Sequence, residues 1–476
     1  MKPPSQETYC SADKLTFVSA RKVKCDEGRP HCNRCTSTSR TCGGYPPQSK
    51  QIFTWDDLLR RATIGVTPKL TDISEEECRS VDFYRHTAGP RMANWFDSSF
   101  WNHTVLQVST SNPTAWHALV TLSAVCERRI RPGDTGGATE NFIFQHYNLS
   151  LRKIASSSEN GDINIALLAC IIFFSIEALL GQKHAALNHI RHGMIMLYSS
   201  PGVSDWTWEY LAPIFLRLGC NDFLLHGMGP LLPSNHAQHQ TTPTDHLFAS
   251  IEESRRQLDI IFAQVARFVG RVNVTRPQTK RFTELHETQN QVLSQLDNWQ
   301  LAHINRVLLS TLTEDDAGAQ AILRVIFLVS KVWTKCILDL SEMSYDYYLD
   351  EFKEMVRLSV EILDEQSRTE CTGKLIDGNE YLFEVEMLPL MCFMATKCRD
   401  FEIRMQALRA MERSVAAKQD NWELRRLCLL ASSVIDREIA VDIGDPGNPD
   451  ETGRRLPPSQ ARVRTPCIRD IGPPNA

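Results

Sequence analysis

Apolar residues recur at intervals of three and four over most of the chain, from about residue 76 to residue 440. This spacing places them on one face of an α-helix, whereas a half-buried strand alternates apolar and polar residues. The stretches 166–180 and 187–197 both show it, and Gly181 separates them. It is repeated at Ala321, Leu323, Ile326, Val329 and Val332, at Phe352, Met355, Leu358, Val360 and Ile362, and at Leu424, Leu427, Leu430 and Val434. The pattern predicts a mainly α fold with a large all-α helical array.

Prolines and shifts in composition divide the chain into four parts. A polar stretch begins at Gly43, and Pro46 and Pro47 can neither continue a helix nor donate backbone hydrogen bonds. The tail contains GDPGNPDETGRRLPPSQ, which is rich in Gly and Pro and predicts disorder. The predicted parts are an N-terminal module over 1–45, a linker over 46–75, a helical domain over 76–440 and a disordered tail over 441–476.

The net charge differs between these parts. The whole chain carries −5, but residues 1–50 hold nine Lys/Arg against four Asp/Glu and carry +5, which leaves −10 for the remainder. A basic end can attract a polyanion such as nucleic acid, whereas the acidic remainder would repel one. Apolar residues make up 42% and charged residues 23%, which argues against a chain that is disordered throughout.

No stretch predicts a signal peptide or a membrane helix. The opening MKPPSQETYCSADK is polar, and the most apolar stretch, Ile165 to Phe174, is followed closely by Ser175 and Glu177. A helix needs about 20 apolar residues to span a bilayer. We therefore expect no membrane partner and an intracellular chain with reduced cysteines. Clustered cysteines then indicate metal ligands, and scattered ones indicate buried apolar side chains.

Five of the fifteen cysteines fall within the first 42 residues, and four follow the spacing Cys25-x6-Cys32-x2-Cys35-x6-Cys42. Thiolates are favoured zinc ligands, and a two-residue spacer lets both sulfurs reach one ion. Four core cysteines of a small fold are the weaker alternative, because almost no aliphatic residue lies between Lys24 and Cys42. Metal binding would therefore supply the folding energy of this module. The predicted zinc ligands are Cys25, Cys32, Cys35, Cys42 and Cys10.

The stretch RKVKCDEGRPHCNRCTSTSRTCGGYPP, from Arg21 to Pro47, closely resembles the binuclear zinc cluster of fungal transcription factors. In that family two zinc ions share six cysteines, in two Cys-x2-Cys-x6-Cys runs joined by a loop with a proline, which Pro30 matches. The resemblance covers four of the six cysteines. At positions 15 and 18, where the first two ligands are expected, this chain has Leu15 and Val18.

Three explanations for the missing pair stay open. Residues 1–20 can stem from a mistaken exon boundary, so that the true chain carries the first Cys-x2-Cys. Cys10 can instead join the four later cysteines in a rearranged site, most simply one zinc held by four of the five. The cluster can also have been lost, which leaves a regulator that acts through its helical domain.

The resemblance implies that a short helix around Arg21 to Lys24 enters the major groove of duplex DNA. Lys22 then takes the family's base-reading position beside Arg21, and a lysine there can donate to the O6 and N7 acceptors of guanine in CGG-type half-sites. The charges that would neutralise phosphates are those of Lys24, Arg29, Arg34 and Arg40. A solvated surface or a nuclear import signal is the alternative use of these charges.

The region 76–440 resembles the helical regulatory domain that follows many such clusters. The resemblance lies in FYRHTAGPRMANWFDSSFWNHTVLQVSTSNPTAWHALVTLSAVCE from Phe83, LLACIIFFSIEALLGQKHAALNHIRHGMIML from Leu167 and MLPLMCFMATKCRDFEIRMQAL from Met387. No G-x-S-x-G, glycine-rich phosphate loop or His-Glu-x-x-His is present. We therefore predict no enzyme.

Several other residues of this region are of types that can bind metals or catalyse reactions, but their positions in the sequence favour structural roles. We expect His189 and His192 to be surface or satisfied core residues, and Cys392 and Cys398 to pack in the core. The run Glu75 to Glu77 is predicted to be a solvated helix start. A metal role for His236 and His239, in loop-like sequence, is disfavoured.

Together these observations predict a zinc-dependent, sequence-specific DNA-binding transcription factor in the nucleus. Its expected partners are double-stranded DNA and the transcription machinery of RNA polymerase II genes, among them metabolic or secondary-metabolite genes. The alternative is a helical interaction protein that has lost DNA binding because the cluster is incomplete. Residues 46–75 show no sustained heptads, so a monomer and a homodimer through the large domain both stay open.

Overall fold

The chain divides into two compact units, Met1–Val66 and Thr67–Ala476. The computed structural model describes two short pieces of the first unit and most of the second. The described residues are 17–18, 23–24, 73–92, 96–131, 139–156, 162–226, 248–274, 279–309, 314–371, 380–416, 422–442 and 456–464.

In the first unit, the strands β1 (Phe17–Val18) and β2 (Val23–Lys24) pair antiparallel. Phe17 lies opposite Lys24 and Val18 opposite Val23. The helix expected around Arg21 to Lys24 is therefore wrong for Val23 and Lys24, whose backbone is extended. Aromatic and β-branched residues favour strands, and the pairing involves Val18, at a position where the family has a cysteine.

The second unit is built from helices, in agreement with the predicted mainly α fold. Its first half contains α3 (Glu75–Phe83), η1 (Tyr84–Ala88), α4 (Gly89–Met92), η2 (Phe100–Thr104), α5 (Val105–Ser111), α6 (Pro113–Ile130), α7 (Glu140–Ser156), α8 (Ile163–Leu179), α9 (Lys183–Ser199), η3 (Thr207–Leu211) and α10 (Ala212–His226). Its second half contains α11 (Ile251–Val274), α12 (Thr279–Leu309), α13 (Glu314–Cys336), η5 (Met343–Tyr348), α14 (Leu349–Cys371), α15 (Glu380–Lys397), α16 (Phe401–Ala416) and α17 (Trp422–Asp442).

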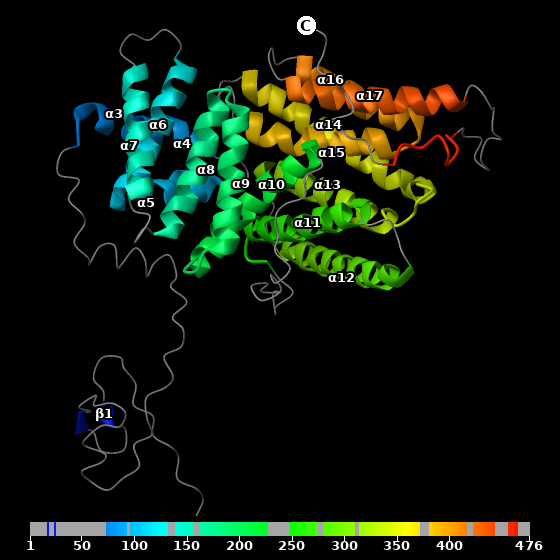
Figure 1. The fold of residues 1–476 in the computed structure, drawn as a ribbon, viewed down its shortest axis with the longest axis horizontal. Helices are drawn as coiled ribbons and strands as arrows, with labels where there is room; N and C mark the ends of the chain where they lie inside the picture. The colour runs from blue at the N-terminus through cyan, green and yellow to red at the C-terminus, as the bar shows by residue number, and fades with distance from the viewer. Residues whose placement is uncertain are drawn as a thin grey trace, which may run out of the picture. The chain divides into compact units, whose positions relative to one another are not determined.

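Helices that follow one another in sequence pack side by side across the array (Figure 1). Contacts run from α6 to α7 and α8, from α8 through α9 and α10 to α11, and on to α12 and α13. The last helices, α14 to α17, pack among themselves, and α15 also contacts α10. One hydrophobic core therefore extends through the described part of this unit.

Two helices, α8 and α13, are apolar over most of their length. In α8 every residue from Leu167 to Leu179 is buried, as expected for a helix packed on all sides. The stretch Ala317–Cys336 within α13 is long and apolar enough to cross a membrane, but 72% of its apolar 18-residue window is buried inside the helical unit, as in a core helix.

Local capping explains where two helices of the first half begin. The side chain of Asn112 accepts hydrogen bonds from the backbone N–H groups of Thr114 and Ala115, and Pro113 occupies the first helical position of α6. Ser74 and Glu77 form a capping box at the start of α3, in which each side chain accepts from the other's backbone N–H. This box fixes the position of Glu77.

A buried charge network joins the end of the array to the last described residues. The carboxylate of Glu438 accepts from the guanidinium groups of Arg399 and Arg404, and all three side chains are almost completely buried. Arg399 and Lys397 also contact the carboxylate of Glu342, a buried residue with a left-handed φ of 59°. Burial lowers the pKa of Lys397 to about 8, although the Glu342 carboxylate opposes that change.

The predicted disordered tail is therefore wrong for residues 456–464. Arg462 is 7% exposed and forms two hydrogen bonds of 2.9 and 2.6 Å with the carboxylate of Asp346. The N–H of Val463 donates to Glu438. The composition is that of a flexible tail, but hydrogen bonds to the carboxylates of Asp346 and Glu438 hold Arg462 and Val463 in place.

Candidate functional site

The residues predicted to bind zinc and DNA lie outside the described part of the chain. The side chains concerned are those of Cys10, Cys25, Cys32, Cys35, Cys42, Arg21, Lys22, Lys24, Arg29 and Arg34, and for Lys24 the structure describes the backbone of β2 alone. Their roles stay predictions.

The structure describes the side chains of eight cysteines, and seven of them are buried. Cys392 and Cys398 pack in the core, as predicted, and burial raises the pKa of both thiols to about 12. Neither cysteine belongs to the one grouping of three metal-ligating side chains among the described residues.

The two histidines of α9 also have structural roles. The His189 ring stacks on Phe173 with their centroids 5.3 Å apart, and burial lowers the pKa of His189. His192 is exposed. His192 is thus a surface residue, as predicted, whereas His189 is half-buried and packs against an aromatic ring of α8.

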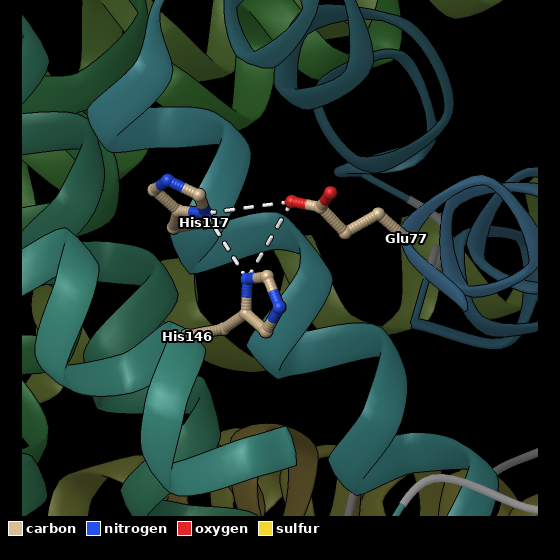
Figure 2. Close-up of side chains that lie close together, drawn as sticks. All are labelled: Glu77, His117 and His146. Carbon is tan, nitrogen blue, oxygen red and sulfur yellow. Dashed lines mark hydrogen bonds and ion pairs between the residues drawn. The ribbon is translucent and has the colours of Figure 1, made fainter. Parts of the chain in front are cut away.

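A different group of side chains brings metal-binding atoms together (Figure 2). Glu77 comes from the first turn of α3, His117 from α6 and His146 from α7. The two Nδ1 atoms of the histidines are 3.0 Å apart, and Oε1 of Glu77 lies 3.8 Å from that of His117 and 3.7 Å from that of His146. Among the described residues this is the one grouping of three such side chains whose ligand atoms converge.

The prediction that Glu75 to Glu77 form a solvated helix start is wrong for Glu77. Glu75 and Glu76 are exposed, but Glu77 is 7% exposed, because the capping box turns its side chain toward α6 and α7. Its Oε2 accepts from the backbone N–H of Ser74 at 2.8 Å, and its Oε1 accepts from Nε1 of Trp116 at 3.1 Å. The Ser74-x-x-Glu77 pattern is the sequence signal that indicates this position.

Burial sets the charges of the grouping. Burial raises the pKa of Glu77, but the hydrogen bonds from Ser74 and Trp116 and the nearby histidines outweigh it, and the net pKa is lowered. Burial lowers the pKa of His117 to about 4, and the neighbouring His146 adds to this effect. Burial also lowers the pKa of His146. At neutral pH the grouping therefore holds one carboxylate and two neutral imidazoles.

Residues 19–52 match the fungal Zn(2)-Cys(6) binuclear cluster domain. The resemblance read from Arg21 to Pro47 is therefore confirmed, and the domain of this family binds two zinc ions. Within the match the chain supplies Cys25, Cys32, Cys35 and Cys42, which suffice for one tetrahedral zinc ion. Even with Cys10 the donor set is one cysteine short of the six that the family uses for two ions.

Two curated relatives are named as transcription regulators. The chain is 26% identical over 267 residues to the aspercryptin biosynthesis cluster-specific transcription regulator atnN of Emericella nidulans, covering 49% of this chain and 43% of the relative. It is 28% identical over 201 residues to the transcription regulator lscL of Purpureocillium lilacinum, covering 37% of this chain and 47% of the relative. The chain thus spans less than half the length of either relative. No solved structure matches it.

Proposed function

We propose that the protein is a zinc-dependent, sequence-specific DNA-binding transcription regulator that acts in the nucleus on RNA polymerase II genes. The observation that carries this proposal is the match of residues 19–52 to the fungal zinc cluster domain, followed by a large helical unit. The name of the relative atnN extends the proposal to genes of a secondary-metabolite cluster. The helical unit would carry regulation and contacts with the transcription machinery or a second copy, and we propose no catalysis.

The basic residues have distinct parts in the proposed DNA complex. Lys22, with Arg21 beside it, would donate to guanine in CGG-type half-sites, because the major-groove edge of guanine presents two acceptors. Lys24, Arg29, Arg34 and Arg40 would neutralise phosphates, which sets position and supplies salt-dependent affinity.

A second candidate function is regulation through the helical unit without DNA contact. It is favoured by Leu15 and Val18, which replace two expected ligands, and by the strand pairing of Val18 with Val23. Under this candidate the cysteine segment holds no zinc and reads no DNA.

Binding of the full chain to duplex DNA distinguishes the two candidates. Fluorescence anisotropy would compare a CGG-containing duplex with a duplex of scrambled sequence at 50 and 200 mM salt. Four phosphate contacts give a log–log salt slope of about −3.6, so affinity should fall about 150-fold between these concentrations. Equal affinity for both duplexes contradicts sequence-specific reading, and absence of binding at low salt favours the helical regulator.

A further inference from the structure

The three side chains of the Glu77 grouping face one another without completing a hydrogen-bond network. The two Nδ1 atoms, 3.0 Å apart, can share one proton. Oε1 of Glu77, at 3.7 and 3.8 Å, is too far from either ring nitrogen for a hydrogen bond. A carboxylate oxygen and two imidazole nitrogens therefore surround a common point without all being hydrogen-bonded to one another.

The dimensions of this triangle suit a zinc ion. The distances of 3.0, 3.7 and 3.8 Å place one point of their plane about 2 Å from each of the three atoms. Zinc binds imidazole nitrogen at about 2.0–2.1 Å and carboxylate oxygen at about 2.0–2.2 Å. Little movement of the side chains is needed to admit the ion.

We propose that Glu77, His117 and His146 bind a zinc ion in the helical unit, at a site separate from the N-terminal cysteines and independent of the proposed DNA binding. Two histidines and one carboxylate form a three-ligand set that leaves a position for water. The His117 side chain is 14% exposed, which gives solvent a route to that position.

The surroundings hold the ligands in the required orientation. The N–H of Ser74 fixes Oε2 of Glu77, and the Trp116 indole fixes Oε1. Hydrogen bonds of this kind, behind the ligands, orient carboxylates in metal sites.

The bound ion would join three helices that are distant in sequence. It would connect the first turn of α3 to α6 and α7, in addition to the hydrogen bond from Trp116 of α6 to Glu77 of α3. Metal binding should therefore stabilise the start of the helical unit against unfolding.

The test counts zinc ions per chain, so zinc bound by the N-terminal cysteines must not contribute to the count. The parent for the test is the full chain with Cys10, Cys25, Cys32, Cys35 and Cys42 all changed to Ser. Metal analysis after equilibration with micromolar zinc and gel filtration should find about one zinc ion per chain. In the same background His117→Gln and Glu77→Gln should lose that ion, while His184→Gln, a change at an exposed histidine of α9, should keep it.

Thermal unfolding followed by circular dichroism supplies a second readout. Added zinc should raise the Tm of the parent and of His184→Gln by a few °C, and leave those of His117→Gln and Glu77→Gln unchanged. A folded parent that takes up no zinc overturns the proposal, and so does zinc that persists in both ligand variants. If the cysteine-free chain does not fold, cobalt added to the natural sequence provides the test. A cobalt site without thiolate absorption, lost in Glu77→Gln, is then required.

Discussion

The cysteine segment and the helical unit are stabilised by different means. Between Lys24 and Cys42 almost no aliphatic side chain is present, so a fold there depends on a metal ion. The helical unit buries a continuous apolar core and neutralises its buried charges with one another. A change of its metal ligands should therefore unfold the segment while the helical unit stays folded.

The largest effect is expected from removing two zinc ligands at once. Cys32→Ser/Cys35→Ser should abolish binding to the CGG duplex and lower the zinc content, because the module has no other source of folding energy. The free energy of unfolding of the helical unit, measured with urea, should change by less than about 0.5 kcal/mol, as it does for surface substitutions far from the core. Unchanged DNA affinity would contradict the dependence on zinc.

Glu438→Ala should destabilise the helical unit strongly and leave the cysteine segment unaffected. It removes the shared partner of Arg399 and Arg404, whose guanidinium groups then stay buried with less compensation. Breaking a buried pair costs about 3–5 kcal/mol. Urea unfolding measures it, with Glu361→Ala as control, since the exposed pair of Glu361 with Arg357 contributes about 0.3–0.5 kcal/mol.

Lys22→Ala should weaken DNA binding without changing stability. Loss of a contact to guanine costs about 1–3 kcal/mol, and discrimination between the CGG and scrambled duplexes should decrease with it. Arg409→Ala, a change at an exposed arginine of α16, serves as the control. An equal loss of affinity for both duplexes would assign Lys22 to phosphate instead of base contact.

Gly193→Ala should destabilise the helical unit although alanine is the better helix former. A Cβ at this position of α9 would clash with the ring of Phe215, which is fully buried in α10. Overpacking costs about 1–3 kcal/mol, against a gain of about 1 kcal/mol in helix propensity. Thermal unfolding should show a lower Tm, and the further change Phe215→Leu should restore part of it.

The smallest expected effect is the contribution of His303 to the loss of stability at low pH. Its Nδ1 lies 2.9 Å from Oγ of Ser254, its ring stacks on Trp299, and burial lowers its pKa to about 4, helped by Arg306. Because the unfolded chain takes up this proton near pH 6.5, the stability contribution is complete above that pH and is lost as pH falls toward 4. Between pH 7 and 5 the natural chain should lose about 1 kcal/mol more than His303→Gln, after allowance for partial solvation. Equal losses would contradict the lowered pKa.

The helix pattern was predictable because burial follows the period of the helix. On the predicted apolar face of 187–197, Ile190, Met194 and Leu197 are buried and Leu187 is half-buried. The Glu77 grouping was not predictable, since its three residues come from helices whose packing no local pattern specifies. The spacing of the cysteines indicated the zinc module, but the family resemblance predicted a helix at Val23, where the backbone is extended and pairs with Val18.

The attachment of Arg462 has a consequence for the order of protein synthesis. Asp346 is made 116 residues before Arg462, and at about 5–20 residues per second this interval lasts about 6 to 23 s on the ribosome. During that time the acidic groups of Asp346 and the backbone carbonyl of Glu342 lack their final partner. The segment from Glu342 to Asp346 therefore acquires its final hydrogen bonds only after the helices α14 to α17 have been made.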